Sequence, residues 1–169
     1  MKIAIIGFGN MGQTYASSFV SSGFIKSEDI FVLSRNLTAI SNKYTMPNEN
    51  FFTEISTSFL SVDIVIIAVK PQDFNSLCLQ IKDFISEKHL ILSVMAGISI
   101  ENISNKLQTK KIIRSMPNIS TQIGQGMTVF TASEEVDRKD LFIIQNLINT
   151  TGKSLFIENE EMINAATAI

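Results

Sequence analysis

A glycine-rich segment near the start of the chain constrains the fold more than any other feature. It reads GFGNMG, residues 7–12, and directly follows the short apolar run Lys2–Ile6, which predicts a β-strand. After it, Met11, Tyr15 and Phe19 repeat every four residues, which predicts an amphipathic helix. The pattern G-x-G-x-x-G between a strand and a helix is typical of a turn that holds the pyrophosphate of a dinucleotide. The alternative is a tight structural turn whose glycines are incidental.

Each glycine has a physical role in a turn of that kind. Gly7 permits the sharp change of direction, Gly9 lets a pyrophosphate approach the backbone, and Gly12 lets the helix lie close to the strand. The N–H groups of Asn10 and Met11 would then face the phosphates, together with the positive end of the helix dipole. Because the dipole contributes only ~0.3–1 kcal/mol per nearby charge, we expect backbone hydrogen bonds to carry most of the binding.

Short apolar runs that predict strands recur along the rest of the chain. The segment Asp63–Lys70 contains six consecutive apolar residues, Ile64–Val69, as in a strand covered on both faces in the middle of a parallel sheet. Further strands are predicted at Ile30–Leu33, Leu90–Val94, Lys111–Arg114, Met127–Phe130 and Ser154–Ile157, with a weaker pattern at Phe51–Phe52.

Helices are predicted between these strands. Gly23 can end the first one in the left-handed conformation, and Ser99, Ser133 and Asn159 can each cap the start of another. The predicted helices after the first are one following Pro71 with the apolar face Phe74, Leu77, Cys78, Ile81, Phe84 and Ile85, a short one from Ser99 through Leu107, a longer one from Ser133 that Gly152 closes, and a final one from Asn159 to Ile169. Strands alternating with helices predict an α/β fold, which is a Rossmann-like, doubly wound, mainly parallel sheet with helices on both faces.

Composition limits the kind of partner. Of the 169 residues, 45% are hydrophobic and 18% are charged, which indicates a packed globular domain. The net charge of −2 argues against a nucleic-acid surface, which would need concentrated positive charge. No apolar run approaches the ~20 residues that cross a bilayer. The single cysteine cannot form an internal disulfide, so we predict a cytoplasmic protein without a membrane partner.

The residues after the second predicted strand bear on which dinucleotide fits. An NAD-preferring site usually has Asp or Glu here, which accepts hydrogen bonds from the ribose hydroxyls. This chain has Ser34, Arg35 and Asn36 instead. A charge-assisted bond from Arg35 to a 2′-phosphate could supply ~1.5–3 kcal/mol, enough for an about ten- to hundredfold preference. We therefore predict NADP(H), with NAD(H) as the alternative cofactor, and a merely solvated loop arginine as the alternative role for Arg35.

Longer motifs carry a resemblance to a known family. They are AVKPQ at residues 68–72, SVMAGISIE at 93–101, RSMPNISTQIGQGMTVF at 114–130 and NEEMINAATAI at the end, in addition to GFGNMG. With these motifs the sequence resembles pyrroline-5-carboxylate reductase over essentially its whole length. That family reduces a cyclic imine, 1-pyrroline-5-carboxylate, to L-proline with a nicotinamide cofactor, so the resemblance implies an oxidoreductase of proline biosynthesis.

The resemblance also implies which residues bind the cofactor. By position, the pyrophosphate would lie on Gly7, Phe8, Gly9, Asn10, Met11 and Gly12, the ribose phosphate on Ser34, Arg35 and Asn36, the length of the cofactor along Ala68, Val69, Lys70 and Pro71, and the nicotinamide half beside Ala96 and Gly97. The turn Met116–Pro117–Asn118 could shape the nicotinamide pocket, or it could be a plain structural turn. Lys70 could approach the phosphates or ribose, or simply end a strand at the surface.

The chain departs from the family at two places. Near Glu54–Ser56 the family often has an asparagine that reaches the cofactor, whereas the position corresponds to Ile55 here, unless the alignment shifts by one residue. In the family, a helical C-terminal domain also follows, which mediates dimerisation and forms most of the imine pocket. We therefore expect residues 1–158 to be the NADP-binding Rossmann domain and residues 159–169 to begin a helix that leads to that domain. The parent protein would be a homodimer or a higher homo-oligomer.

The sequence gives no reason to assign a catalytic role to His89 or Cys78. His89 lies between a predicted helix and strand, where a surface role is expected, and Cys78 lies on an apolar helix face as a buried thiol. No Cys/His spacing suits a metal, and hydride transfer needs none of these groups because the cofactor carries the chemistry. We predict no catalytic residue and no metal ligand in this chain. Two alternative functions remain open, a dehydrogenase of the β-hydroxyacid type and a non-catalytic NADP-binding module that regulates a partner through the final helix.

Overall fold

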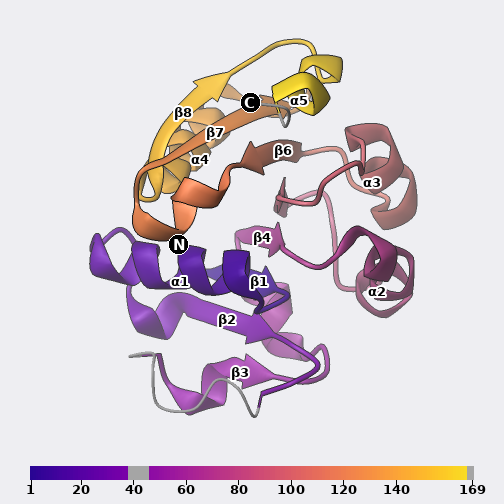
Figure 1. Ribbon diagram of the computed structural model, residues 1–169. Coiled ribbons are helices and arrows are strands. Elements are labelled where there is room, and N and C mark those ends of the chain that lie inside the picture. The colour runs from indigo at the N-terminus through magenta and orange to yellow at the C-terminus, as the bar shows by residue number, and fades with distance from the viewer. Residues whose placement is uncertain (38–45, 167–169) are drawn as a thin grey trace.

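The computed structural model describes residues 1–37 and 46–166, and a single sheet of eight strands forms its centre (Figure 1). The strands are ordered β3-β2-β1-β4-β5-β6-β7-β8 across the sheet. Their bounds are β1 Ile3–Ile6, β2 Ile30–Leu33, β3 Phe51–Phe52, β4 Ile64–Ile67, β5 Leu90–Ser93, β6 Ile112–Pro117, β7 Gly126–Ala132 and β8 Gly152–Phe156. All neighbouring strands in this order are parallel except β6 and β7, so the predicted mainly parallel sheet is confirmed.

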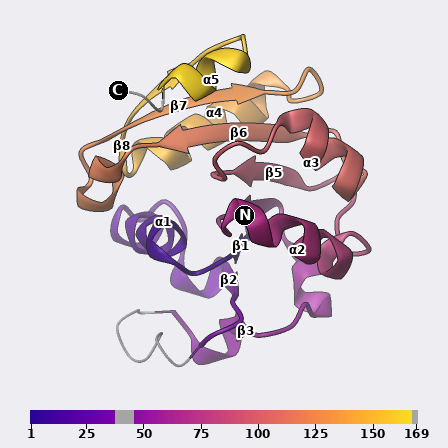
Figure 2. The same cartoon turned by 45° about the vertical axis from the view of Figure 1, so that its right-hand side comes forward.

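Helices cover both faces of the sheet, as Figures 1 and 2 show together. Helix α1 (Asn10–Ser21) and helix α4 (Arg138–Asn149) pack into one core cluster. Helix α2 (Phe74–Ile81) and helix α3 (Ile100–Leu107) pack into the other, and α5 (Glu161–Ala166) lies beside β6 and β7. Short 3₁₀ turns occupy Ser27–Asp29, Asn48–Asn50, Thr57–Ser61, Pro71–Asp73 and Ile119–Ile123.

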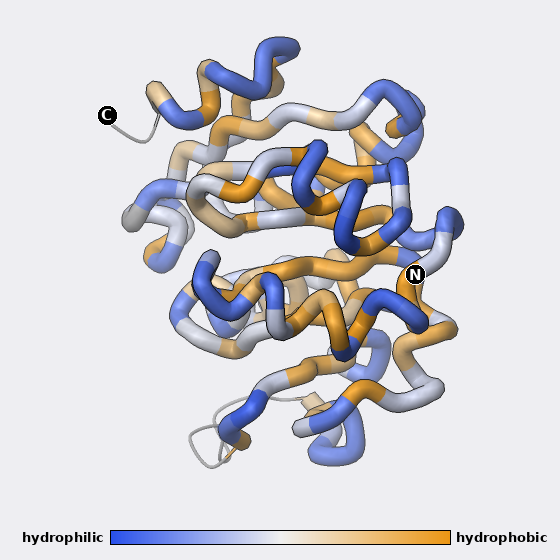
Figure 3. The backbone as a smooth tube through the Cα atoms, turned by 90° about the vertical axis from the view of Figure 1, so that its right-hand side faces the viewer, coloured by the Kyte–Doolittle hydropathy of each residue, from blue (hydrophilic) through white to orange (hydrophobic). Residues whose placement is uncertain are grey.

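The apolar runs of β1, β4 and β5 are continuous because these strands are buried at every position. In β1, Ile3 and Ile5 belong to the cluster under α1, whereas Ala4 and Ile6 belong to the cluster under α2. Successive side chains of a strand point to opposite faces, so a strand covered on both faces needs apolar residues at every position. Figure 3 shows the resulting hydrophobic interior along the strands. Each fully buried isoleucine stabilises the fold by about 1.5–3 kcal/mol relative to an exposed one.

The strand order creates a crevice beside β1. This strand pairs with β2 on one side and with β4 on the other. The chain leaves β1 toward α1 on one face, and it leaves β4 toward α2 on the opposite face. The loops after these two strands therefore diverge, and ligands of doubly wound sheets bind at such a point.

Most predicted elements are confirmed, with corrections at their ends. Gly23 has φ +69° and follows α1 as predicted, and the Ser99 hydroxyl caps α3 by accepting from the Asn102 N–H. Helix α2 ends at Ile81, so the prediction that Phe84 and Ile85 extend its apolar face was wrong. Asn159 accepts from the Glu161 N–H at the start of α5, as expected of a cap, and residues 167–169 of the predicted final helix lie outside the described residues.

The prediction that Ser133 and Gly152 bound the long helix was wrong at both ends. The Ser133 hydroxyl donates to the Lys110 carbonyl and accepts from the Ile112 N–H, so it joins the end of β7 to the start of β6. Asp137 caps α4 instead and accepts from the Asp140 N–H, a bond that lowers the pKa of Asp137. Gly152, with φ +144°, begins β8. Ser133 and Asp137 are both residue types that cap helices, but Ser133 bonds the backbone at the start of β6, so Asp137 caps α4.

A buried arginine fastens α5 to the sheet. The side chain of Arg114 on β6 is only 3% exposed, and its Nη1 lies 2.9 Å from Oε1 of Glu160. Its Nη2 donates to Asn164 Oδ1 at 2.8 Å, and the same Glu160 oxygen accepts from the Ile100 N–H at the start of α3. One charge pair thus joins β6, α3 and the segment that begins α5. Ile163 adds a fully buried apolar contact.

In the part of the chain that the structure describes, no helix combines the length and the apolar character that crossing a bilayer requires.

Candidate functional site

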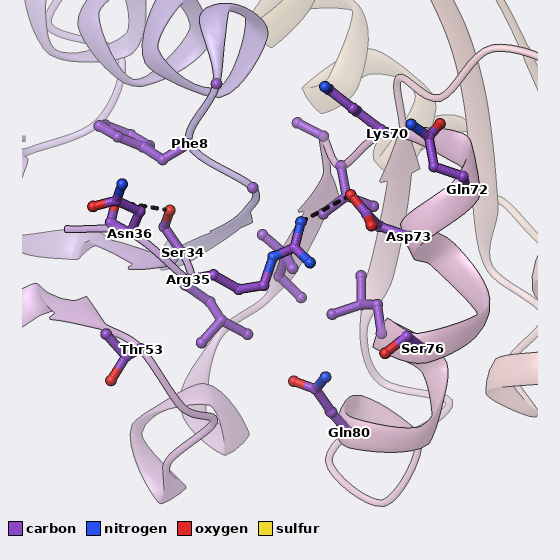
Figure 4. A pocket seen from close by; sticks show the side chains of 17 residues that line it. Phe8, Ser34, Arg35, Asn36, Thr53, Lys70, Gln72, Asp73, Ser76 and Gln80 are labelled. Carbon is purple, nitrogen blue, oxygen red and sulfur yellow. Dashed lines mark hydrogen bonds and ion pairs between the residues drawn. The ribbon is translucent and has the colours of Figure 1, made fainter. Parts of the chain in front are cut away.

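A cavity of 490 Å³ opens at the carboxyl ends of β1, β2 and β4, in the crevice that the strand order creates. Its walls are the glycine turn, the segment after β2, the end of β4 and one side of α2, and Figure 4 shows the side chains around it. The lining residues that the sequence predicted are Gly7, Phe8, Gly9, Ser34, Arg35, Asn36, Ala68, Val69 and Lys70. The structure therefore brings three segments together that are far apart in the sequence.

Close packing fixes the glycine turn at two positions. Gly7 has φ +94°, and a Cβ there would lie 2.7 Å from the carbonyl carbon and oxygen of Ala68. A Cβ on Gly12 would fall onto the Gly7 carbonyl oxygen, because α1 runs so close to its own entry turn. These two glycines are required by the protein itself, without any reference to a ligand.

Gly9 is different, because the protein does not require it. It has an ordinary backbone conformation, with φ −75°, and a Cβ there would have no atom within 4 Å outside Gly9 and its two chain neighbours. Gly9 is the N-cap of α1, and it has no side chain to bond the N–H groups of the first turn. Those groups lack partners within a helix, so a site for an anion is left at the cavity wall.

Asn10, Met11 and Gly12 do not line the cavity. Asn10 and Met11 begin α1, and Gly12 is buried beneath the turn. Their side chains therefore have no direct place in the cavity, and Asn10 and Met11 can take part only through the backbone at the helix start.

The segment after β2 places an arginine across the cavity. The Ser34 N–H donates to the Phe52 carbonyl at 2.9 Å, which holds the segment beside β3. Arg35 extends toward the 3₁₀ turn Pro71–Asp73 that precedes α2, where its Nη2 lies 2.9 Å from Oδ2 of Asp73 (Figure 4). The Arg35 side chain is 82% exposed and that of Asp73 is 30% exposed. The end of β2 carries no acidic residue, and Asp73 in the turn before α2 places a carboxylate beside Arg35 instead.

The end of β4 supplies the floor of the cavity. The Ala68 N–H donates to the Ile6 carbonyl at 2.8 Å, which keeps the end of β4 next to the glycine turn. Lys70 lines the cavity, so it is more than a distant strand end. Pro71 begins a 3₁₀ turn and is not among the lining residues.

The predicted nicotinamide residues are not part of this cavity. Ala96 and Gly97 follow β5, with Gly97 at φ +71°, and neither lines the cavity. Met116 and Pro117 belong to β6, and Asn118 accepts from the Met127 N–H through its Oδ1 at 3.2 Å. Asn118 thus has a structural role in the turn between β6 and β7.

Sequence reasoning missed the α2 side of the cavity. On that side the missed lining residues are Gln72, Asp73, Ser76, Leu77 and Gln80, and elsewhere they are Ile6, Leu33 and Thr53. Asp73, Ser76 and Gln80 are spaced by three and four residues, so they share one side of the helix. That polar spacing is the signal in the sequence for the α2 side of the cavity. Ile55 packs partly buried against the α2 core cluster, while Thr53 reaches the cavity.

The side chains set aside by the sequence analysis lie in the core. The surface prediction for His89 was wrong, because this side chain is fully buried. Its Nδ1 accepts from the Ser86 N–H at 2.9 Å, and burial lowers its pKa. Cys78 is buried as predicted, and burial raises the pKa of its thiol to about 11. Among the residues that the structure describes, no group of three or more His, Cys, Asp or Glu side chains could hold a metal ion.

Comparison with known proteins extends these observations. The family model described as "NADP oxidoreductase coenzyme F420-dependent" matches residues 2–97. Pyrroline-5-carboxylate reductase of Aquifex aeolicus is 33% identical, and the match covers 100% of this chain and 62% of that protein. The chain thus spans about three fifths of the length of such curated relatives, and the resemblance predicted from the motifs is confirmed along the whole chain.

Solved structures agree with the fold. A pyrroline-5-carboxylate reductase from Coxiella burnetii superimposes with a TM-score of 0.90 at 25% identity, over 99% of this chain and 63% of that one. The Plasmodium falciparum pyrroline carboxylate reductase, solved with NADP bound, gives a TM-score of 0.83 at 22% identity, over 99% of this chain and 64% of that one. With the glycine turn, the strand order and the family model in agreement, the chain belongs to the family of NADP oxidoreductases described as coenzyme F420-dependent.

Proposed function

We propose that the cavity binds NADP(H), with its pyrophosphate against the first turn of α1. Gly9 is the observation that carries this proposal. The fold tolerates a Cβ at this position, since no atom beyond Gly9 and its two chain neighbours lies within 4 Å of it, and yet the residue is a glycine. A pyrophosphate that rests on the backbone there explains why no side chain is present. Asn10, Met11 and Gly12 would contribute the helix start, and Phe8 the adjoining wall.

The adenosine end of the cofactor would reach the segment after β2. Arg35 offers a guanidinium in the cavity, and Ser34 and Asn36 flank it. A guanidinium binds a phosphate by charge-assisted hydrogen bonds, which favours the 2′-phosphorylated cofactor over NAD(H). From there the cofactor would pass along Ala68, Val69, Lys70 and Pro71 toward Ala96 and Gly97, since β4 and β5 are neighbours in the sheet.

We further propose that the whole protein reduces 1-pyrroline-5-carboxylate to L-proline. The support is the similarity to reductases of that name over the full length of this chain, which favours this reaction over a hydroxyacid dehydrogenase or a regulatory module. The bound cofactor would supply hydride to the carbon of the substrate C=N bond. The residues of this chain would hold and orient the cofactor, and none of them is proposed as a catalytic acid. Assembly as a homodimer and a cytoplasmic location stay predictions.

The binding proposal is tested by replacing Gly9 with alanine. Gly9→Ala should leave the melting temperature within about 2 °C of the original, because the methyl group meets no protein atom. The same change should weaken NADPH binding at least about tenfold, because the methyl group occupies the place of the pyrophosphate. Calorimetry and NADPH fluorescence measure the affinity. Unchanged affinity in the folded variant would contradict the proposed pyrophosphate position.

The reaction proposal is tested on polypeptides of two lengths. The 169-residue chain should bind NADPH but reduce 1-pyrroline-5-carboxylate very slowly, because the resemblance implies that most of the imine pocket lies in the two fifths of the relatives that it does not match. Fusing the corresponding segment of the Aquifex aeolicus enzyme after residue 166 should raise turnover. Rapid turnover by the 169-residue chain alone would show that the substrate site lies within it.

A further inference from the structure

The pair between Arg35 and Asp73 spans the mouth of the cavity. Arg35 belongs to the segment after β2, and Asp73 belongs to the turn before α2, so the bond joins two walls that the chain reaches by separate routes. Figure 4 shows the two side chains directed toward each other across the opening. At 2.9 Å the carboxylate occupies one of the positions at the guanidinium that a phosphate oxygen would take.

The Asp73 carboxylate is available for this contact because it bonds no N–H group of its own helix. Asp73 ends the 3₁₀ turn Pro71–Asp73, which continues directly into α2, and its backbone is helical, with φ −86° and ψ −12°. A capping residue has an extended backbone, so Asp73 is not placed to cap α2. Its side chain makes no capping bond, and its Oδ2 accepts from Arg35. The start of a helix also favours a negative charge, so the position suits both α2 and the contact with Arg35.

We propose that Asp73 determines cofactor specificity by competing with the 2′-phosphate for Arg35, and this rests on the proposed NADP(H) function. A 2′-phosphate brings a charge of about −1.5 to −2 to the arginine. Asp73 must then move away or share the guanidinium, and it repels the phosphate in either case. An unphosphorylated ribose has no phosphate to bind Arg35, so the ion pair between Arg35 and Asp73 stays intact. Asp73 therefore moderates a preference that Arg35 alone would make stronger.

The test compares the affinities of NADPH and NADH in the 169-residue chain and its Asp73→Asn variant. Removing the carboxylate charge should tighten NADPH binding about three- to tenfold and change NADH binding by less than about twofold. Adenosine 2′-phosphate and adenosine 5′-phosphate serve as smaller probes and should show the same contrast. Asp83→Asn removes a charge from the exposed segment after α2, outside the cavity, and should change neither affinity.

A double-mutant cycle with Arg35→Gln separates competition from general repulsion. If Asp73 acts through Arg35, the gain from Asp73→Asn should shrink to about twofold or less when the guanidinium is absent. Asp73→Ser, which keeps a short polar side chain, replaces Asp73→Asn if the latter unfolds.

Three results would overturn the proposal. They are an unchanged ratio of NADPH to NADH affinity, a loss of NADH affinity alone, and an equal gain in the Arg35→Gln background. Failure of the original chain to bind either nucleotide would be a different result, because it removes the proposed function itself.

Discussion

On one side of the cavity the chain passes from β1 into α1 through Gly7–Gly12, and on the other it passes from β4 into α2 through Lys70–Asp73. The first wall consists of backbone, with a Cβ excluded at Gly7 and Gly12 by atoms of the protein. The second wall consists of polar side chains, among them Asp73, Ser76 and Gln80. The two walls face the same cavity at the same edge of the sheet.

The comparison distinguishes residues that stabilise the fold from residues that determine which ligand binds. The first wall cannot be altered at Gly7 or Gly12 without moving main-chain atoms, because its shape there comes from direct contact between backbone segments. A side-chain wall can be altered residue by residue, since the apolar face of α2 holds the helix in place independently of its polar face. We therefore expect substitutions of Gly7 and Gly12 in the first wall to change stability, and substitutions of Asp73 in the second wall to change ligand preference.

The largest effect should come from Gly12→Ala. The methyl group would fall onto the Gly7 carbonyl oxygen, so the start of α1 must shift away from β1. Overpacking of this kind costs about 3 kcal/mol, or roughly 6–12 °C in melting temperature for a chain of this size. A thermal melt by circular dichroism measures it, with Gly9→Ala as the matched control in the same turn. Equal melting temperatures for both variants would break the distinction between the two kinds of glycine.

The next largest effect should come from Arg35→Asp, which should reverse the cofactor preference. The change removes the proposed partner of the 2′-phosphate and leaves two carboxylates at the opening. We expect NADPH to lose about ten- to a hundredfold in affinity relative to NADH, or ~1.5–3 kcal/mol, with little change in melting temperature because the side chain is 82% exposed. Calorimetric titrations with both nucleotides provide the ratio. A ratio that does not move would mean that Arg35 does not contact the phosphate.

A smaller effect should appear in the pH dependence of the free energy of unfolding, through His89 in the segment that follows α2. Burial lowers the pKa of His89 in the folded chain below its unfolded value of about 6.5, so below that value the unfolded chain binds more protons. The stability that neutral His89 allows is fully present above about pH 6.5 and falls as the pH drops toward the folded pKa. Urea midpoints at pH 7.5 and 5.5 should differ, and His89→Gln should reduce that difference. An equal slope in the variant would assign the pH dependence to other groups.

The smallest effects should come from Ser76→Ala and Gln80→Ala on the polar face of α2. Both positions are exposed, so stability should change by less than about 0.5 kcal/mol, and nucleotide affinity by less than about threefold. Chemical denaturation and NADPH titration measure the two quantities in parallel. A large loss of stability in either variant would show that this wall, too, is needed by the fold.

Sequence patterns predicted the middle of the sheet well because β1, β4 and β5 bury both faces. The uninterrupted run Ile64–Val69 and the glycine turn left few other arrangements, and the predicted mainly parallel sheet was confirmed. The predicted start of a helix was wrong where two nearby residues could both cap it. Ser133 and Asp137 were both capable caps, and only the position of β6 decides between them. His89 was misplaced because a polar residue between a helix and a strand gives no sign that the Ser86 turn will cover it.

The cavity was predicted only in part for a related reason. Glycines and strand ends have fixed positions in this fold, so Gly7, Gly9 and Lys70 could be placed from the sequence. The pairing of Arg35 with Asp73 joins residues 38 positions apart, and no local pattern relates them. Ala96 and Gly97 follow β5 and lie outside the cavity lining, so their predicted place beside the nicotinamide stays a prediction.

The charge pair at Arg114 limits how α5 can move. A slip of one helical turn, about 5.4 Å, would carry Asn164 away from a guanidinium that is 3% exposed and would strain its bond to Glu160. A cation left uncompensated in such surroundings costs several kcal/mol, far more than an exposed ion pair contributes. Intermediate registers are therefore unfavourable, and α5 has one stable position on the sheet. It should detach as a unit rather than slide.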